Sequence, residues 1–206
     1  MFRIPASKTR AAALLPETLA PIHDIRGLAL RGLMVAAGVL LMTLSAKIRI
    51  PMWPVPVTMQ TFAVITLGAV MGARMGLLTL LAYLTIGALG ADVFTASGRG
   101  VTGLAYLTGP TAGYLLGFAV AAWLLGRFAE RGYDRSVGGM ALAAFAGTVA
   151  IYALGLAWMG WLFAAERGWD WVVHWGLVAF LPGEALKLAL AALLLPALRR
   201  VVPNRN

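Results

Sequence analysis

The sequence FLPGEALKLAL, residues 180–190, places an acid and a base, Glu184 and Lys187, inside a run of leucine and alanine. They carry the only formal charges between Asp170 and Arg199, an interval apolar and long enough to cross a bilayer as a helix. An ionisable group near the centre of such a helix costs about 2.5–3.5 kcal/mol on insertion scales. Because they are three residues apart, the two side chains share one helix face and can pair there. We therefore predict that they point into a polar cavity that binds a small polar or charged solute.

An alternative interpretation needs no ligand. The two charges would neutralise each other near a helix end, and both side chains would reach toward the membrane interface. The two interpretations differ in one structural respect, because the first buries the pair beside a hollow and the second exposes it.

The composition indicates an integral membrane protein of the all-α class. Hydrophobic residues make up 61% of the 206 residues, charged residues make up 12%, and the mean hydropathy is +0.83. A soluble core of this size cannot hide so much apolar surface. One membrane domain, residues 28–200, would lie between an N-terminal arm at 1–27 and a tail at 201–206. Uncharged runs predict six transmembrane helices within residues 32–46, 50–73, 75–91, 100–126, 136–165 and 171–198.

The basic residues predict the orientation of these helices, because lysine and arginine collect in short cytoplasmic loops. With the N-terminus inside, twelve of the 17 lysines and arginines would lie on the inner side, four on the outer side, and Lys187 in the membrane. We therefore expect both termini to be cytoplasmic. The net charge of +9 then reflects topology and attraction to anionic lipid, so we expect no nucleic-acid partner.

Two residue types that often build reactive sites are scarce. The chain has no cysteine, which excludes disulfides, thiolate metal sites and cysteine nucleophiles. It has only two histidines, so a histidine-built metal centre is not expected. We predict no metal, no cofactor and no catalytic residue.

Three segments at the outer ends of the predicted helices contain the unusual polar chemistry. Three prolines in the sequence IPMWPVPVTMQT, residues 50–61, exclude a helix and require a rigid extended segment that ends near Thr58 and Gln60. The second segment is GADVFTASGRG, residues 90–100, and the third is the approach to the last helix, residues 166–183. Non-helical backbone at membrane depth is tolerated only where it packs in protein or lines a cavity. We therefore predict an outward-facing site formed by these segments, with the last helix as its floor.

The residue types in these segments suggest which ligand the site would take. Acids accept hydrogen bonds from N–H groups, and bases donate to carboxylate or carbonyl oxygens. The candidate residues are the charged Asp92, Arg99, Glu184 and Lys187, the polar Thr58 and Gln60, and the aromatic Trp53 and Phe94. This lining suits an amphipathic molecule that has amide-like N–H groups and a carboxylate.

Small residues at helical spacing predict close approach between helices. Gly32 and Ala36 form such a stripe on the first predicted helix, and Gly109, Gly113 and Gly117 form another on the fourth. For the fourth helix we expect the partner to be another helix of the same chain.

Three motifs occur in a recognisable order: PVPVTMQT at residues 54–61, GPTAGYLLGF at 109–118 and PGEALK at 182–187. Together they closely resemble the BioY family, the substrate-binding S components of energy-coupling-factor (ECF) biotin transporters. The resemblance covers residues 28–198. It implies a six-helix S-component fold in the bacterial inner membrane, an outward-facing biotin site, and partners that are an ECF transmembrane coupling protein and its ATPase subunits.

The resemblance also implies roles for individual residues. The family's acid and lysine on the last helix match Glu184 and Lys187, which would hold the polar groups of biotin. A carboxylate accepts the ureido N–H bonds, and the ammonium meets either the ureido oxygen or the valerate carboxylate. Family members also use an asparagine near helices three and four, which this chain lacks there, so Asp92 is the candidate acceptor and Arg99 a candidate for the carboxylate. The family's docking stripe on the first helix matches Gly32 and Ala36, although this pair departs from an alanine pair.

Two other functions remain as alternatives. One is an S component for another small vitamin on the same scaffold. The other is an intramembrane serine hydrolase, for which Ser97 and His174 would form the dyad, but no oxyanion hole can be assigned. The sequence has no Gly-x-x-x-x-Gly-Lys-Ser/Thr loop, so uphill transport would need an ATPase partner.

Overall fold

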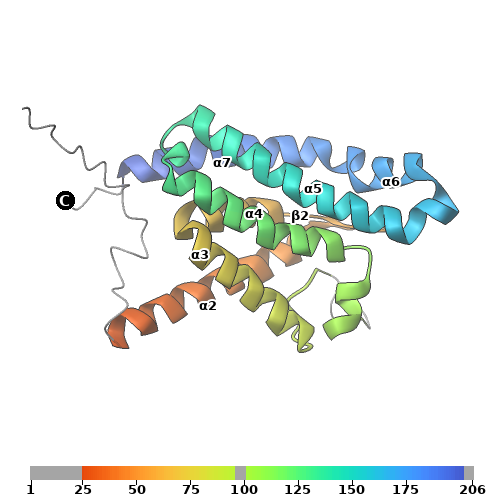
Figure 1. Ribbon diagram of the computed structural model, residues 1–206, viewed down its shortest axis with the longest axis horizontal. Helices are drawn as coiled ribbons and strands as arrows, with labels where there is room; N and C mark the ends of the chain where they lie inside the picture. The colour runs from red at the N-terminus through yellow and green to blue at the C-terminus, as the bar shows by residue number, and fades with distance from the viewer. Residues whose placement is uncertain (1–24, 96–100, 202–206) are drawn as a thin grey trace, which may run out of the picture.

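Five helices are long and apolar enough to cross a membrane in the computed structural model, which describes residues 25–95 and 101–201 (Figure 1). The predicted all-α membrane fold is therefore confirmed. The helices are α2 (Ile25–Lys47), α3 (Gln60–Ala88), α4 (Ala112–Glu130), α5 (Val137–Arg167), and a broken last span made of α6 (Trp169–Gly176) and α7 (Leu181–Val201). The short elements are β1 (Arg49–Ile50), β2 (Val57–Thr58) and the 3-10 turns η1 (Gly103–Thr108), η2 (Tyr133–Arg135) and η3 (Val178–Phe180).

The long helix α3 consists of two arms that reverse direction at Gly72. Gly72 has φ 77°, a backbone conformation that favours glycine. A straight helix would separate Gly68 and Gly76 by about 12 Å, yet a methyl group placed on Gly76 would lie 3.4 Å from the Gly68 Cα. The second and third predicted helices are these two arms, so the prediction of six helices is confirmed when the arms are counted separately.

The reversal of α3 is held by a side chain of α4. The second arm begins at Ala73, whose backbone N–H donates to Glu130 Oε1 at 2.9 Å. The first N–H groups of a helix have no partner within the helix, so a carboxylate placed there satisfies one of them. Glu130 thus joins the end of α4 to the turn of α3.

Three of the uncharged runs contain residues outside their helix, and each has a local cause. The prediction that the prolines of residues 50–61 exclude a helix is confirmed, because these residues form the turn of a small hairpin between β1 and β2 and α3 begins only at Gln60. The helix predicted from residue 100 begins at Ala112, just after Pro110, which restricts the residue before it to extended backbone. The last predicted helix is broken between Gly176 and Leu181 and resumes with Pro182 in the first turn of α7, where its missing N–H is not needed.

The centre of the bundle is α4, which packs against both α3 and α5 through glycines. A methyl group on Gly117 would lie 2.7 Å from the Ile151 Cα, and one on Gly113 would overlap the Leu154 carbonyl oxygen. The expectation that this stripe packs within the chain is therefore confirmed for Gly113 and Gly117, whereas Gly109 precedes α4 and ends the turn η1. In contrast, only 17% of the most apolar stretch of α2 is buried, and this helix lies along one edge of the bundle (Figure 1).

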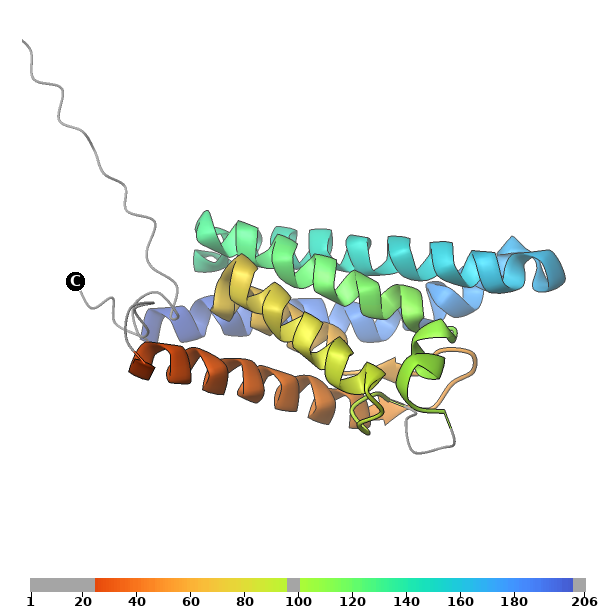
Figure 2. The same ribbon diagram turned by 60° about the horizontal axis from the view of Figure 1, so that its bottom comes forward.

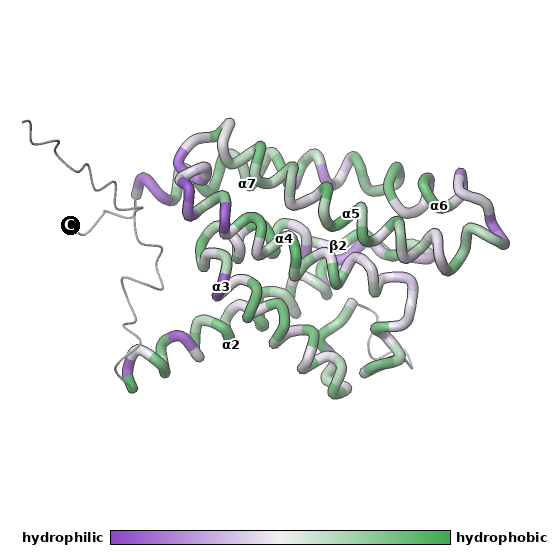
Figure 3. The backbone as a smooth tube through the Cα atoms, viewed as in Figure 1, coloured by the Kyte–Doolittle hydropathy of each residue, from purple (hydrophilic) through white to green (hydrophobic). Residues whose placement is uncertain are grey.

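Hydrophilic residues gather at the two ends of the bundle, and apolar residues dominate the spans between them (Figure 3). The first described residue of α2 and the last of α7 lie at the same end (Figure 2). That end carries the arginines of the α2 start, the α3 reversal, the α4–α5 turn and the α7 end: Arg26, Arg31, Arg74, Arg127, Arg131, Arg135, Arg199 and Arg200. The opposite end carries Lys47, Arg49 and Arg167 and includes all the outer segments that the structure describes.

Candidate functional site

The two charges of the last helix form an ion pair inside the protein. Lys187 Nζ donates to Glu184 Oε1 at 2.6 Å, and the side chains are 7% and 5% exposed, respectively. This burial contradicts the alternative in which both side chains reach the membrane interface. The pair is therefore placed where its charges need support from the protein or from a ligand.

The break in the last span explains where Glu184 lies. Because α7 begins at Leu181, Glu184 falls in the first turn of this helix. Carboxylates are stabilised there by the unpaired N–H groups and by the positive end of the helix dipole. Lys187 follows three residues later, close enough for its ammonium to donate to the carboxylate.

One oxygen of Glu184 is fully engaged and the other is not. Oε1 accepts from Lys187 and also from Thr61 Oγ1 at 3.1 Å. Oε2 is buried and has no hydrogen-bond partner among the described residues. Tyr152 lies near the carboxylate without forming a hydrogen bond of normal geometry. A buried acceptor left without a donor costs about 1–3 kcal/mol, so this oxygen can take a donor either from a ligand or from a small movement of the Tyr152 hydroxyl.

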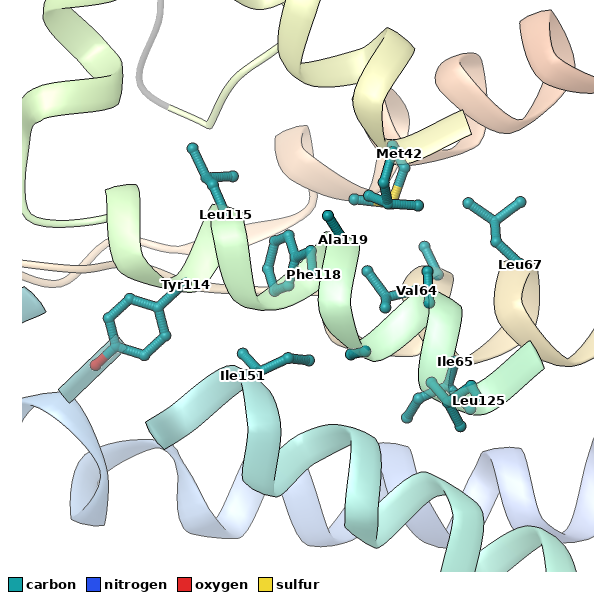
Figure 4. Packing of buried hydrophobic residues seen from close by; sticks show 14 of the residues in the cluster. Met42, Val64, Ile65, Leu67, Tyr114, Leu115, Phe118, Ala119, Leu125 and Ile151 are labelled. Carbon is teal, nitrogen blue, oxygen red and sulfur yellow. The ribbon is translucent and has the colours of Figure 1, made fainter. Parts of the chain in front are cut away.

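Glu184 belongs to the wall of a pocket between α3, α4, α5 and α7. Most of the wall is aromatic or aliphatic, and a few hydroxyl and amide groups lie at one side, a composition typical of small-molecule sites. Figure 4 shows four of the wall residues, Tyr114, Leu115 and Phe118 on α4 and Ile151 on α5. The full lining is Val55, Pro56, Thr58, Gln60, Thr61, Thr95, Tyr106, Thr111, Tyr114, Leu115, Phe118, Ile151, Tyr152, Phe180 and Glu184.

Gln60 connects the polar groups of this wall. Its Nε2 donates to the Tyr83 hydroxyl at 2.9 Å, and its Oε1 accepts from Thr95 Oγ1 at 3.2 Å. Its backbone N–H donates to Thr58 Oγ1 at 3.2 Å, which closes a short turn between β2 and α3. The structure therefore brings Thr58, Gln60 and Glu184 together around one pocket, as the sequence predicted, with Lys187 directly behind Glu184.

Two predicted aromatic residues lie elsewhere. Trp53 is 59% exposed and packs against Phe163 and Trp171, with the Arg167 guanidinium 5.8 Å from its ring centroid. It is outside the pocket lining. Phe94 is fully buried, but it lies behind the wall, where its ring stacks on Tyr106 with centroids 4.7 Å apart.

The two charged loop residues also differ from the pair on α7. Asp92 accepts from Lys47 Nζ at 2.6 Å, and its side chain is 61% exposed, so it lies at the surface and outside the pocket lining. Arg99 lies outside the described residues. Ser97 of the alternative hydrolase dyad does too, and His174 is exposed.

Several wall residues were not assigned to the site from the sequence. Two of them lie in motifs quoted above: Thr61, whose hydroxyl donates to Glu184, follows Gln60 directly, and Tyr114 lies within residues 109–118. Tyr106 and Tyr152 carried no such signal, because an aromatic residue in an apolar stretch is more often core than pocket.

The predicted docking stripe is on the outer surface of the bundle. Gly32 and Ala36 are both exposed on α2, and no atom lies within 4 Å of a methyl group placed on Gly32. The stripe therefore has no packing role among the described residues.

Comparison with known proteins gives a consistent result. The family model described as the BioY family matches residues 17–204. A protein named Biotin transporter BioY from Thermotoga maritima is 34% identical over 165 residues, which is 80% of this chain and 93% of the relative. A probable biotin transporter BioY from Pyrococcus horikoshii is 33% identical over 161 residues, which is 78% of this chain and 91% of the relative.

A solved structure shows the same fold. The crystal structure described as the S-component for biotin from an ECF-type ABC transporter matches with a TM-score of 0.68 and covers 84% of this chain and 90% of that chain. Its sequence identity is 23%, so this likeness bears on the fold alone.

Proposed function

The chain belongs to the BioY family, and we propose that it binds biotin at the outer face of the membrane as the substrate-binding S component of an ECF transporter. Relatives that share a third of its sequence are named biotin transporters. The protein is a multi-pass membrane protein with the S-component fold. It acts in transport and is not an enzyme.

The unpartnered Oε2 of Glu184 is the observation that carries this proposal. A carboxylate that is buried, charged and open on its pocket side is complementary to a ligand that brings N–H donors. The ureido ring of biotin has two N–H groups on a planar frame. One of them would donate to Oε2 and restore the hydrogen bond that the protein leaves unmade, which favours binding of biotin over an apolar molecule of the same shape.

Lys187 would act mainly by holding the Glu184 carboxylate in place as its ion-pair partner. Its ammonium has three N–H donors, of which one is used on Glu184 Oε1. Charge-assisted bonds of this kind are shorter and stronger than neutral ones. The resemblance gives the remaining donors to an oxygen of the ligand, either the ureido oxygen or the valerate carboxylate, which would require Lys187 to reach past Glu184 into the pocket.

The rest of the pocket would accommodate the remaining parts of biotin. Tyr106, Phe118 and Phe180 offer apolar surface to a sulfur-containing ring and an alkyl chain. The hydroxyl groups of Thr58 and Thr95 both donate to Gln60 Oε1 and would have to turn away from it to donate to a carboxylate. We keep Arg99 as a candidate for that carboxylate and Asp92 as a candidate acceptor, although Asp92 is already paired with Lys47.

The partners of the protein would be an ECF transmembrane coupling protein and its ATPase subunits. Because Gly32 and Ala36 are exposed on a helix that is mostly outside the core, the α2 surface is available for another helix to approach closely. The arginine-rich end of the bundle would face the cytoplasm of a bacterial cell, and both termini would then lie inside.

Titration of the purified full-length protein with biotin tests the proposal. We expect tight binding that weakens at least tenfold, or about 1.4 kcal/mol, in Glu184→Ala, because biotin N–H groups would then be buried without an acceptor. Glu166→Ala is the matched control, since Glu166 is an exposed carboxylate outside the pocket lining.

Two results would reject the proposed ligand. One is unchanged biotin affinity in Glu184→Ala, which would place the site elsewhere. The other is the absence of biotin binding together with saturable binding of a different vitamin, such as thiamine or riboflavin, which would support the alternative that the scaffold serves another substrate.

A further inference from the structure

Three consecutive backbone carbonyls, those of Val93, Phe94 and Thr95, are each held by a side chain from another element. We call residues 93–95 the strap. The Val93 oxygen accepts from the Tyr83 hydroxyl at 3.0 Å, and the Phe94 oxygen accepts from Lys47 Nζ at 3.0 Å. The Thr95 oxygen accepts from the Arg49 guanidinium. The strap belongs to no helix or strand, so side chains make the bonds that a regular ladder would otherwise supply.

The other face of the strap forms part of the pocket wall. Thr95 is 5% exposed, lines the pocket, and donates to the amide oxygen of Gln60. Phe94 stacks on Tyr106, which also lines the pocket. The strap therefore has cations on its outer side and wall-forming side chains on its inner side.

The two cations are themselves well placed to hold this backbone. Lys47 is the last residue of α2, and Arg49 is the first residue of β1, so they are two residues apart and reach adjacent carbonyls. Lys47 also pairs with Asp92 at 2.6 Å, which fixes its ammonium beside the strap. Neither side chain lines the pocket.

We propose that Lys47 and Arg49 are positioning residues that hold the strap against the pocket and thereby set how slowly a bound ligand leaves. This inference rests on the proposed function, because it takes the pocket as the ligand site. The cations act through Thr95 and Phe94, and the chemistry that recognises the ligand stays with Glu184. Loss of a cation would loosen one wall without removing any group that touches the ligand.

The test compares dissociation rates in the purified full-length protein. Labelled biotin is bound, unlabelled biotin is added in excess, and loss of label is followed in wild type, Lys47→Gln, Arg49→Gln and the double variant. We expect dissociation to be faster on the order of tenfold in Arg49→Gln, since a hydrogen bond from a charged donor is lost, and faster still in the double variant. Arg49→Lys should recover most of the wild-type rate, because an ammonium can also donate to a carbonyl.

Arg74→Gln is the matched control, because it removes the same charge from an exposed site at the reversal of α3. A second measurement needs no ligand: hydrogen–deuterium exchange of the peptide that contains the strap should speed up in Arg49→Gln and stay unchanged in Arg74→Gln. This separates the two proposals, since failure of wild type to bind biotin would refute only the ligand. The positioning role would be overturned if the double variant exchanged hydrogen in the strap, and released biotin, at the same rates as the wild-type protein.

Discussion

Two buried carboxylates, each partnered by a cation of α7, lie at opposite ends of the bundle. Glu184 is 4% exposed and pairs with Lys187 on its own helix. Asp134 is 2% exposed, lies in η2 between α4 and α5, and pairs with Arg199 near the end of α7. Only the first carboxylate borders the pocket.

The difference between the two pairs shows how one helix can carry both a binding group and an anchor. Glu184 and Lys187 lie on the same helix, so their ion pair does not join separate elements. It can instead hold the carboxylate in position for a ligand. The Asp134 pair joins the α4–α5 turn to α7 and fixes the position of that helix end. We therefore expect changes at Glu184 and Lys187 to alter both binding and stability, and changes at Asp134 and Arg199 to alter stability alone.

The largest effect should come from Lys187→Met, which leaves the buried carboxylate of Glu184 without its counter-charge. Breaking a buried pair by removing one partner costs about 3–5 kcal/mol. We expect a large fall in the thermal unfolding midpoint in detergent and a loss of biotin binding.

The double variant Lys187→Met with Glu184→Gln sharpens this prediction. It should recover much of the unfolding midpoint, because no unpaired charge remains, and still fail to bind biotin tightly. Recovery of binding in the double variant would refute a role for the pair in recognition.

The second effect concerns packing at the arginine-rich end. A methyl group on Gly126 would overlap the backbone of Ala73 at the reversal of α3, and overpacking of this kind costs about 1–3 kcal/mol. We expect Gly126→Ala to lower the unfolding midpoint and leave biotin affinity within twofold of wild type.

Gly138→Ala provides the control for this substitution. Nothing lies within 4 Å of a methyl group at Gly138, which is also in a helix, so alanine there should stabilise by about 0.5–1 kcal/mol. Equal effects of the two substitutions would show that the reversal does not depend on close approach.

The third effect is a pH-dependent loss of stability in Arg199→Gln. Burial raises the pKa of Asp134 above its ordinary value, and the Arg199 guanidinium opposes that rise. Without Arg199 the pKa should rise further, so the native state would bind a proton that the unfolded chain releases near its ordinary pKa of about 3.9. Stability of the variant should then fall as the pH rises from about 4 through the raised pKa.

At neutral pH we expect this loss to be about 1 kcal/mol, since the Arg199 side chain is 30% exposed and solvent weakens the pair. The unfolding midpoints of variant and wild type should converge at low pH, where Asp134 is protonated in both. A constant gap at every pH would show that Arg199 stabilises by packing and not by its charge.

The smallest effect should come from Trp53→Ala. Although the sequence made Trp53 a candidate wall residue, it lies on Phe163 and Trp171 outside the pocket lining. We expect biotin affinity to change by less than about threefold, which is well under the 1.4 kcal/mol that corresponds to tenfold. A larger loss, measured by the same titration, would extend the site to the outer rim.

The sequence was sufficient for the membrane class, the helix count and the central pair. Charged residues are so costly in lipid that Glu184 and Lys187 stand out at once, and the prolines before Gln60 exclude a helix on steric grounds alone. These inferences depend on single residues whose physical cost does not change with context.

The remaining part of the site depends on contacts between distant residues. Asp92 was a reasonable ligand candidate until the structure paired it with Lys47, which is 45 residues earlier in the chain. Similarly, the tyrosines of the wall resemble core residues in sequence, because only the packing of α4 against α5 determines which of them face a pocket. The spacing of apolar residues along the sequence predicts neither the pairing of Asp92 nor which tyrosines face the pocket.

The reversal at Gly72 also determines how far a substrate has travelled when it is bound. A continuous helix of the 29 residues in α3 would extend about 44 Å, but folding it in two gives arms that are each shorter than the roughly 30 Å hydrocarbon layer. In the proposed orientation, with Gly72 near the inner boundary of the membrane, the first arm would start below the outer boundary, and so would Gln60 and the pocket beside it. A substrate bound at this depth would already have crossed part of the permeability barrier before the proposed ATPase partner acts.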